Sequence, residues 1–321
     1  MKNCSVCNST DLSKYPYDNH LYRTKKSYIK YPIKYLLARA ISPVLSKFHS
    51  KYCDWADVKL IFSPFSWITR CKNCGYGVYD KSITPRLLEK YYNTVYRARG
   101  LLPDQWQKKD YLEDSRAIGQ YCCVENWIDK FPKLYKLEIG AGKAYFSRLV
   151  KEKHQGEVKL NVVEPGNCWG LYYKELGIPL VAKFFPFESN LKFHYIHTSH
   201  WLEHVSDLCR ALDKIKSLLV KDGLLFIEVP NCSDDYYSLD VGDIPHIHFF
   251  TRESLSILLE KYGFQTLVIG EHGESYREEK ERWKDPENFD KGIIQGAHIS
   301  ILKNVPRKGG ASLRALFKLS G

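Results

Sequence analysis

One stretch decides the fold: Leu134-Tyr-Lys-Leu-Glu-Ile-Gly-Ala-Gly-Lys-Ala-Tyr-Phe146. Its first part alternates apolar residues around Glu138, which is typical of a β-strand. Gly140-Ala141-Gly142 follows, and a helical pattern begins at Ala144. Glycine has no Cβ, so this turn can bend sharply and bring the backbone against a ligand. The stretch predicts a strand, a tight turn and a helix whose free N–H groups face a polar or anionic ligand.

An acid ends the next predicted strand. The run that begins at Val158 is rich in apolar residues and finishes at Glu164, directly before Pro165. A carboxylate in this place can accept hydrogen bonds from both hydroxyl groups of a ribose, as in nicotinamide enzymes. Those enzymes require a third glycine, where this chain has Ala144 or Tyr145. The glycines alone fit an ordinary βα turn equally well, but the added acid favours a nucleoside site.

Three further motifs follow in order: Phe193-His-Tyr-Ile-His-Thr-Ser-His-Trp-Leu-Glu-His-Val205, Gly223-Leu-Leu-Phe-Ile-Glu-Val-Pro-Asn231 and His248-Phe-Phe-Thr-Arg-Glu-Ser-Leu255. With these motifs, residues 115–304 resemble a class I S-adenosylmethionine-dependent methyltransferase. The group it resembles includes bacterial sugar methyltransferases and ubiquinone-type O-methyltransferases. The resemblance implies a Rossmann-like α/β fold with a mostly parallel seven-stranded sheet and an antiparallel last strand.

The pattern between residues 134 and 262 alternates strands and helices, which predicts a parallel sheet covered on both faces. Two last strands are expected near 264–271 and 296–303. Ligands of such sheets bind beyond the carboxyl ends of the strands. We therefore expect Gly140, Glu164 and His200 to lie along one edge.

The resemblance implies S-adenosylmethionine as the cofactor. An acid that often contacts the adenine after the third strand is absent, so we expect Phe184 or Phe185 to stack on the base. Ala144, in the place of the family's third glycine, is small enough for close helix packing. The expected cofactor contacts are Glu138, Gly140, Ala141, Gly142, Glu164, Pro165, Phe184, Phe185 and His200.

His200, Glu203 and His204 follow the fourth strand and would share one face of a helix that starts there. Methyl transfer is an in-line displacement, and an oxygen nucleophile also needs a base that removes its proton. We predict His204 as this base, Glu203 as the group that orients it, and His200 beside the methyl group. The alternative is that His204 only caps or packs the helix.

A metal-dependent reading is also open. In ubiquinone-type relatives, the glutamate and histidine of Leu-Glu-His-Val hold a divalent metal together with an acid three positions earlier. His200 occupies that earlier position here, and imidazole suits a transition ion better than magnesium. His246 and His248 follow the fifth strand and could line the acceptor pocket. The alternative for His248, which resembles the family's histidine before Phe-Thr, is a structural role.

Two Cys-x-x-Cys pairs near the N-terminus predict a structural zinc site with the ligands Cys4, Cys7, Cys71 and Cys74. Each pair can form a knuckle, and Gly75 suits the positive φ that closes the second one. The alternative is a set of buried free cysteines. Many bacterial sugar methyltransferases carry a similar N-terminal four-cysteine module, and the resemblance supports zinc.

These signals divide the chain into four parts: residues 1–82 as a zinc-binding module with a basic helical insert, 83–114 as a linker helix and lid, 115–304 as the methyltransferase domain and 305–321 as a basic tail. The insert could hold an anionic glycan or a membrane surface, or pack as a helix on the catalytic domain. Tyr92 or Tyr96 could reach the active site, and the loop 97–106 could close over it. The tail could contact a membrane or a partner enzyme.

Composition limits the function. The 321 residues carry a formal net charge of +11, which suits an anionic acceptor. The sequence has neither a long apolar run nor an N-terminal signal region, so we expect a cytoplasmic protein, peripheral at most on the inner face of a membrane. In that compartment, cysteines serve as metal ligands or buried thiols rather than disulfides.

The function expected from all this is O-methylation of a sugar, either nucleotide-linked or part of a surface polysaccharide or its lipid-linked precursor. Sugar C-methyltransferases of this type continue into a further domain, which favours oxygen over carbon here. An RNA methyltransferase is the alternative, but no Asn-Pro-Pro-Tyr-like motif or Pro-Cys nucleophile is present, so nucleic acid is the less favoured partner. A module that binds the cofactor or a glycan without turnover is a third possibility.

Overall fold

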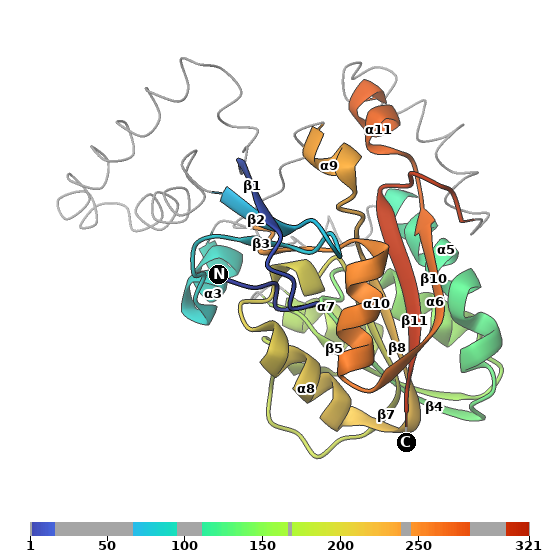
Figure 1. Ribbon diagram of the computed structural model, residues 1–321. Helices are drawn as coiled ribbons and strands as arrows, with labels where there is room; N and C mark the ends of the chain where they lie inside the picture. Colours follow the sequence, from blue (N-terminus) through green and yellow to red (C-terminus); the bar gives the residue numbers. More distant parts are fainter. Residues whose placement is uncertain are drawn as a thin grey trace.

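The computed structural model describes residues 2–16, 67–94, 111–165, 169–238, 245–282 and 306–320. Within them the chain forms a seven-stranded sheet and a smaller four-stranded sheet (Figure 1). The strand order of the large sheet is β10-β11-β8-β7-β4-β5-β6. Its strands are β4 (Lys133–Ile139), β5 (Glu157–Val163), β6 (Leu180–Ala182), β7 (Phe193–Ser199), β8 (Leu219–Pro230), β10 (Phe264–His272) and β11 (Ser312–Leu319).

The large sheet is mostly parallel, as predicted. The pairs β4–β5, β4–β7, β5–β6 and β7–β8 are parallel, and only β11 runs against its neighbours, β8 and β10. The chain order reverses beside β4, because β5 lies on one side of it and β7 on the other. This is the place where an open α/β sheet leaves a crevice for its ligand.

Helices cover both faces of the sheet (Figure 1). The helices α8 (Leu208–Leu218) and α10 (Arg252–Lys261) pack on one face. The other face is covered by α5 (Tyr111–Ile128), α6 (Tyr145–Lys153) and α7 (Trp169–Leu176). The central strands are therefore buried on both sides, which explains why they read as nearly continuous apolar runs.

The last strand corrects the predicted C-terminal boundary of the fold. A strand was expected near 296–303, which lies outside the described residues, and 305–321 was predicted as a basic tail. Instead β11 lies within that tail, between β8 and β10, so the fold does not end at residue 304. The segment was assigned as a tail because of its basic residues. These residues alternate with apolar ones, which is the pattern of a β-strand. One of them, Arg314, is buried and donates to the Glu228 carboxylate at 2.6 Å.

The small sheet has the order β1-β2-β3-β9. Its strands are β1 (Leu12–Pro16), β2 (Trp67–Cys71), β3 (Gly77–Tyr79) and β9 (His248–Phe249). The first three belong to the N-terminal module, but β9 comes from the catalytic part of the chain. The module is thus continuous with the catalytic fold through backbone pairing.

Short helices complete the described structure. They are α3 (Pro85–Thr94), the 3-10 turn η2 (Leu202–His204), α9 (Asp234–Ser238) and α11 (Tyr276–Arg282). The basic insert between the cysteine pairs, Tyr96 and the loop 97–106 lie outside the described residues, so their roles stay predictions. None of the helices in the described part of the chain is both long and apolar enough to span a membrane.

Candidate active site

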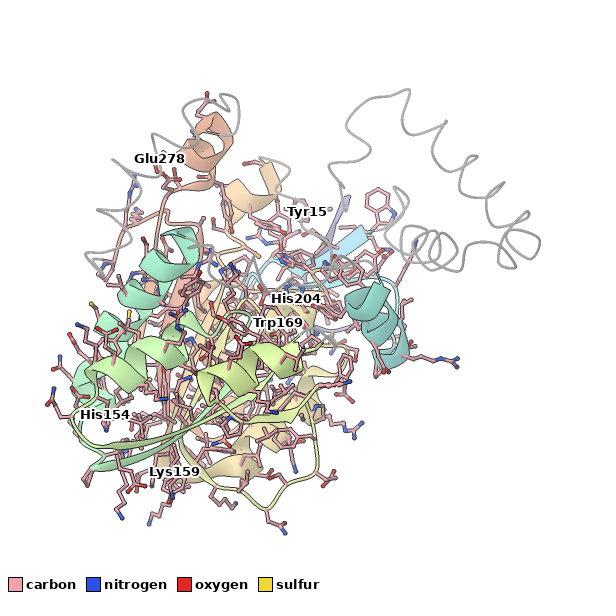
Figure 2. The ribbon with its side chains drawn as sticks, turned by 180° about the vertical axis from the view of Figure 1, so that it is seen from behind. Tyr15, His154, Lys159, Trp169, His204 and Glu278 are labelled. Atoms are coloured by element: carbon pink, nitrogen blue, oxygen red, sulfur yellow. The ribbon has the colours of Figure 1, made fainter. Side chains whose placement is uncertain are left out.

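A cavity of about 880 Å³ lies at the carboxyl ends of β4, β5 and β7. Ligand pockets typically measure roughly 300–1,000 Å³, so a cofactor and part of an acceptor can share this space. Every residue predicted to contact the cofactor lines it, from Glu138 and the glycine turn to His200. His204 and Tyr92 line it too, whereas Glu203 lies buried behind the wall. His204 is labelled near the centre of the view from behind (Figure 2).

The glycine turn forms one wall of the cavity. Gly140 and Gly142 have φ of 73° and 53°, a conformation that favours glycine. A Cβ on Gly140 would lie 3.2 Å from Cβ of Trp201, so the bare backbone also makes room for a neighbour. The Gly142 N–H donates to Oε2 of Glu164 at 2.9 Å. Glu164 therefore anchors the turn as well as facing the cavity.

Aromatic rings stand beside this wall. Phe184 and Phe185 line the cavity as expected, and Phe185 meets Trp201 edge to face with ring centroids 5.4 Å apart. An aromatic ring in this position suits stacking of an adenine. Trp201 was not predicted, although its place directly before Leu-Glu-His-Val could have indicated it.

Glu138 has two buried partners that sequence reasoning missed. Its carboxylate accepts from Nζ of Lys136 at 2.7 Å and from the hydroxyl of Ser147. Burial lowers the pKa of Lys136, while the charge of Glu138 opposes this shift. A lysine inside a buried strand, two residues before an acid on the same face, was the available signal. Both partners contact Oε2 of Glu138 and hold the carboxylate in place from within the protein.

A second wall, called the histidine wall below, consists of His200, His204 and His246, with the carboxylates of Glu203 and Glu228 buried behind it. His200 Nδ1 lies 3.3 Å from Oε1 of Glu203, and its Nε2 lies 3.4 Å from Oε1 of Glu228. Burial and the charge of Arg116 would lower the pKa of His200, but the nearby carboxylates of Glu203 and Glu228 raise it to about 9. The ring is therefore an imidazolium at neutral pH and cannot serve as a base there.

His204 has the opposite character. Burial lowers its pKa to about 4, more than the nearby Glu203 carboxylate raises it, so the ring is neutral at pH 7. Its Nε2 lies 3.7 Å from Oε1 of Glu203, a distance for charge interaction and not for a hydrogen bond. Burial would raise the pKa of Glu203, but the neighbouring rings of His204 and His200 lower it to about 2.

These three residues do not share a helix face, which corrects the prediction. They lie on the end of β7 and on the turn η2, and α8 begins only at Leu208. Asp207 caps that helix by accepting from the N–H of Arg210 at 3.0 Å. An aspartate just before an apolar period was the signal for the later start.

His246 completes a cluster with Glu203 and His204. Its Nε2 lies 3.9 Å from Oε1 of Glu203, and its ring centroid lies 4.7 Å from that of His204. One ligand atom from each of these residues lies within 4.8 Å of the others. Neither carboxylate oxygen of Glu203 has a hydrogen-bond partner among the described residues. Two imidazoles and a carboxylate would suit a transition ion.

His248 does not line the cavity, contrary to one expectation. It is buried, with Nδ1 2.6 Å from the hydroxyl of Tyr76 and Nε2 2.9 Å from the carbonyl of Val205. Burial lowers the pKa of His248 to about 4, so its ring stays neutral. The residue connects the N-terminal module to the catalytic turn.

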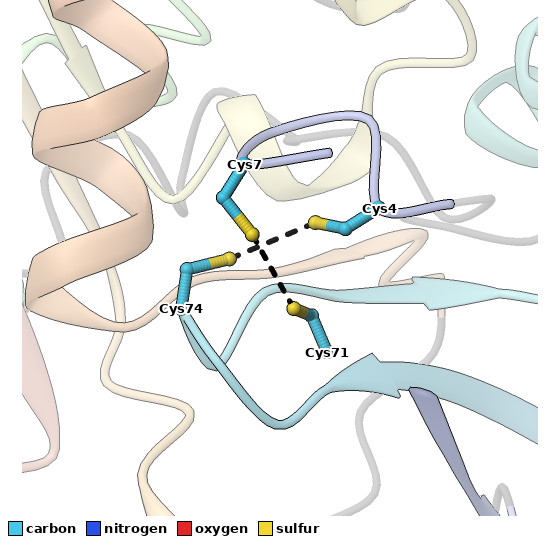
Figure 3. Close-up of side chains that lie close together, drawn as sticks. All are labelled: Cys4, Cys7, Cys71 and Cys74. Atoms are coloured by element: carbon cyan, nitrogen blue, oxygen red, sulfur yellow. Dashed lines mark hydrogen bonds between the residues drawn. The ribbon is translucent and has the colours of Figure 1, made fainter. Parts of the chain in front are cut away.

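The four predicted zinc ligands converge at one point (Figure 3). Sγ of Cys4 lies 3.6 Å from Sγ of Cys74, and Sγ of Cys7 lies 3.5 Å from Sγ of Cys71. Thiolates placed ~2.3 Å from a tetrahedral zinc ion lie about 3.8 Å apart, so the arrangement fits that ion. Gly75 has φ of 75° and closes the second knuckle as predicted.

Residues 125–268 match the sequence model of a family described as "Methyltransferase domain". These residues form a methyltransferase domain. The match spans the glycine turn, Glu164 and the histidine wall. No curated protein sequence matches the chain.

Several solved structures are similar to this methyltransferase. A S-adenosylmethionine-dependent methyltransferase from Archaeoglobus fulgidus is 20% identical, with a TM-score of 0.46 over 67% of this chain and 96% of that one. One from Clostridium acetobutylicum is 12% identical, with a TM-score of 0.44 over 67% and 94%. Coclaurine N-methyltransferase, bound to N-methylheliamine and SAH, is 15% identical, with a TM-score of 0.45 over 66% and 76%.

Proposed function

We propose that this methyltransferase transfers the methyl group to a hydroxyl of a sugar, either nucleotide-linked or part of a surface polysaccharide or lipid-linked glycan. The observation that carries the proposal is the position of the His204 imidazole in the cavity wall, beside the buried carboxylate of Glu203. A hydroxyl group needs such a proton acceptor. The sugar itself is supported by the resemblance of the sequence to bacterial sugar methyltransferases and by the net charge of +11, which suits a phosphate-bearing acceptor.

When bound, S-adenosylmethionine supplies a methyl group on a positively charged sulfur. The glycine turn and Glu164 would hold its nucleoside end, and the rings of Phe185 and Trp201 its base. Nε2 of His204 would take the proton of the attacking hydroxyl. The Glu203 carboxylate, 3.7 Å away, would stabilise the imidazolium that results. The acceleration comes largely from holding the two reactants in line.

The test is transfer of a labelled methyl group from S-adenosylmethionine to two panels of acceptors, nucleotide sugars with lipid-linked glycans in one and bulk RNA in the other. We expect label on a sugar oxygen, identified by mass spectrometry. Label on RNA alone would overturn the sugar assignment and support the alternative. Label on a sugar carbon would leave the acceptor class intact and overturn the role of His204 as a hydroxyl base.

We infer that the four cysteines hold a structural zinc ion, because four sulfurs with this spacing leave no open ligand position. The cluster of Glu203, His204 and His246 is the place where a second, transition ion could bind. Such an ion would polarise the acceptor oxygen in place of a histidine base.

Metal analysis of the purified protein separates these cases. We expect one zinc ion per chain, lost in Cys71→Ser and kept in His246→Asn. Two metal ions per chain, with one lost in His246→Asn, would favour the metal-dependent mechanism. Protein without metal that keeps the same melting temperature after chelation would contradict the structural zinc site.

A further inference from the structure

Strand β9 joins the four-cysteine module to the histidine wall of the cavity. It pairs with β3 of the module. Directly before it, the N–H of Ile247 donates to the Glu203 carbonyl at 2.8 Å, and the Ile247 carbonyl accepts from the N–H of Tyr79 at 2.9 Å. One residue thus connects the module to the turn that carries Glu203 and His204.

A side-chain path runs beside this backbone connection. His248 lies between the hydroxyl of Tyr76 and the carbonyl of Val205. A carbonyl can only accept, so Nε2 of the neutral ring carries the proton and Nδ1 accepts from the tyrosine hydroxyl. The carbonyl of Tyr76 in turn accepts from the N–H of Cys71 at 2.8 Å. The path starts at a predicted zinc ligand and ends one residue after His204.

We propose that Tyr76 and His248 are positioning residues for methyl transfer, which fix the orientation of His204 from the cysteine cluster. The proposal rests on the role given above to His204. Both residues are buried, and neither lines the cavity. Breaking the path therefore alters the placement of the base and leaves the cofactor contacts unchanged.

The chain offers a matched pair of variants. Tyr76→Phe keeps the ring and removes only the donor to His248. Tyr195→Phe breaks a similar buried pair, from the Tyr195 hydroxyl to Nδ1 of His197 at 3.0 Å, on the opposite face of the sheet. We expect Tyr76→Phe to lower kcat about fivefold with an unchanged Kd for S-adenosylmethionine, and Tyr195→Phe to stay within about twofold of wild type. Equal rates for the two variants would overturn the proposal.

Two substitutions of His248 test the hydrogen bond itself. His248→Leu removes the hydrogen bonds to both the Tyr76 hydroxyl and the Val205 carbonyl, and we expect it to slow turnover more than Tyr76→Phe. A glutamine amide can still donate to the Val205 carbonyl, so His248→Gln should recover part of kcat. If the glutamine variant is folded and no faster than the leucine variant, the hydrogen bond does not carry the effect and the proposal fails.

Nitrogen-15 NMR of the histidine rings gives a readout that needs no acceptor. We expect His248 with the proton on Nε2, and shifted ring signals of His204 and His246 in Tyr76→Phe but not in Tyr195→Phe. If these shifts occur in a protein that methylates no sugar, the proposed function is wrong, but the connection from Tyr76 through His248 to His204 is supported. An active enzyme whose Tyr76→Phe variant shows neither shifts nor slower turnover would overturn the path alone.

Discussion

The two walls of the cavity are built in different ways. The glycine wall consists of a short continuous stretch, residues 138–144, and one acid at the end of the next strand. The histidine wall brings together the end of β7, the turn η2, Glu228 of β8 and His246, which are far apart in the chain. The first offers backbone groups in a fixed turn, and the second offers buried charges. Cofactor binding therefore depends on the local geometry of one turn. The chemistry of methyl transfer depends instead on residues that only the tertiary fold brings together.

The largest expected effect is on the histidine wall. His204→Asn removes the predicted base and keeps a polar side chain of similar size. We expect kcat for the sugar acceptor to fall about a hundredfold to a thousandfold, which is within the range that a general base contributes. The Kd for S-adenosylmethionine, measured by calorimetry, should stay within about twofold, because the glycine wall is unchanged.

A matched control is His194→Asn, near the start of β7 and away from the cavity, where the ring accepts from the N–H of Tyr135 at 3.1 Å. This variant should turn over at close to the wild-type rate. Near-normal kcat in His204→Asn would remove His204 as the base. Loss of cofactor binding in that variant would mean that the two walls do not act separately.

The next effect belongs to the glycine wall. Glu164→Ala removes the predicted partner of the ribose hydroxyls and leaves the N–H of Gly142 without its acceptor. Two hydrogen bonds to a charged group are worth roughly 3 kcal/mol or more, so the Kd for S-adenosylmethionine should rise about a hundredfold. Glu157→Ala, at the exposed start of the same strand, is the control and should bind normally. Unchanged affinity in folded Glu164→Ala would place the nucleoside elsewhere.

The same difference explains how much the sequence could predict. Glycines, a terminal acid and period-two apolar runs are local signals, so the turn, the sheet class and the cysteine knuckles were all readable. The seven-stranded sheet is confirmed. The cofactor residues line one cavity as expected, although their individual contacts stay predictions.

The histidines of this wall were predicted, but their buried partners could not be, because those contacts depend on strand pairing. Nothing near His200 in the sequence indicates that Glu228 lies 3.4 Å from its ring. Glu228 meets Arg314 only because β11 inserts beside β8, and that strand was masked by its basic residues. His246 reaches Glu203 through the backbone connection that leads into β9. Buried charges need partners of opposite charge, and no local sequence signal indicates which residues these partners are.

A smaller effect tests the charge of His200. The ordinary pKa of 6.5 is raised to about 9 in the folded protein, so the ring contributes stability that is fully present below pH 6.5 and lost as pH rises through 9. Against His200→Gln, the wild type should be more stable by on the order of 2 kcal/mol at pH 6, and this difference should shrink by pH 9.5. Urea unfolding at both pH values measures it. A difference independent of pH would mean that His200 is neutral.

The smallest effect concerns Ala144, where the family often has a third glycine. Its φ of 51° and ψ of 36° are left-handed, which costs roughly 1–2 kcal/mol for a residue with a Cβ. Ala144→Gly relieves this strain but loses a fully buried methyl group and gains chain entropy when unfolded, each worth about 0.5–1 kcal/mol. The free energy of unfolding should therefore change by less than about 1 kcal/mol, and cofactor affinity by less than about twofold. Gly140→Ala is the matched opposite, because its new Cβ adds the same left-handed strain and also presses on Trp201. If Ala144→Gly lowers the free energy of unfolding more than Gly140→Ala does, the stability of this wall depends on the packing of α6 and not on the conformational freedom of the turn.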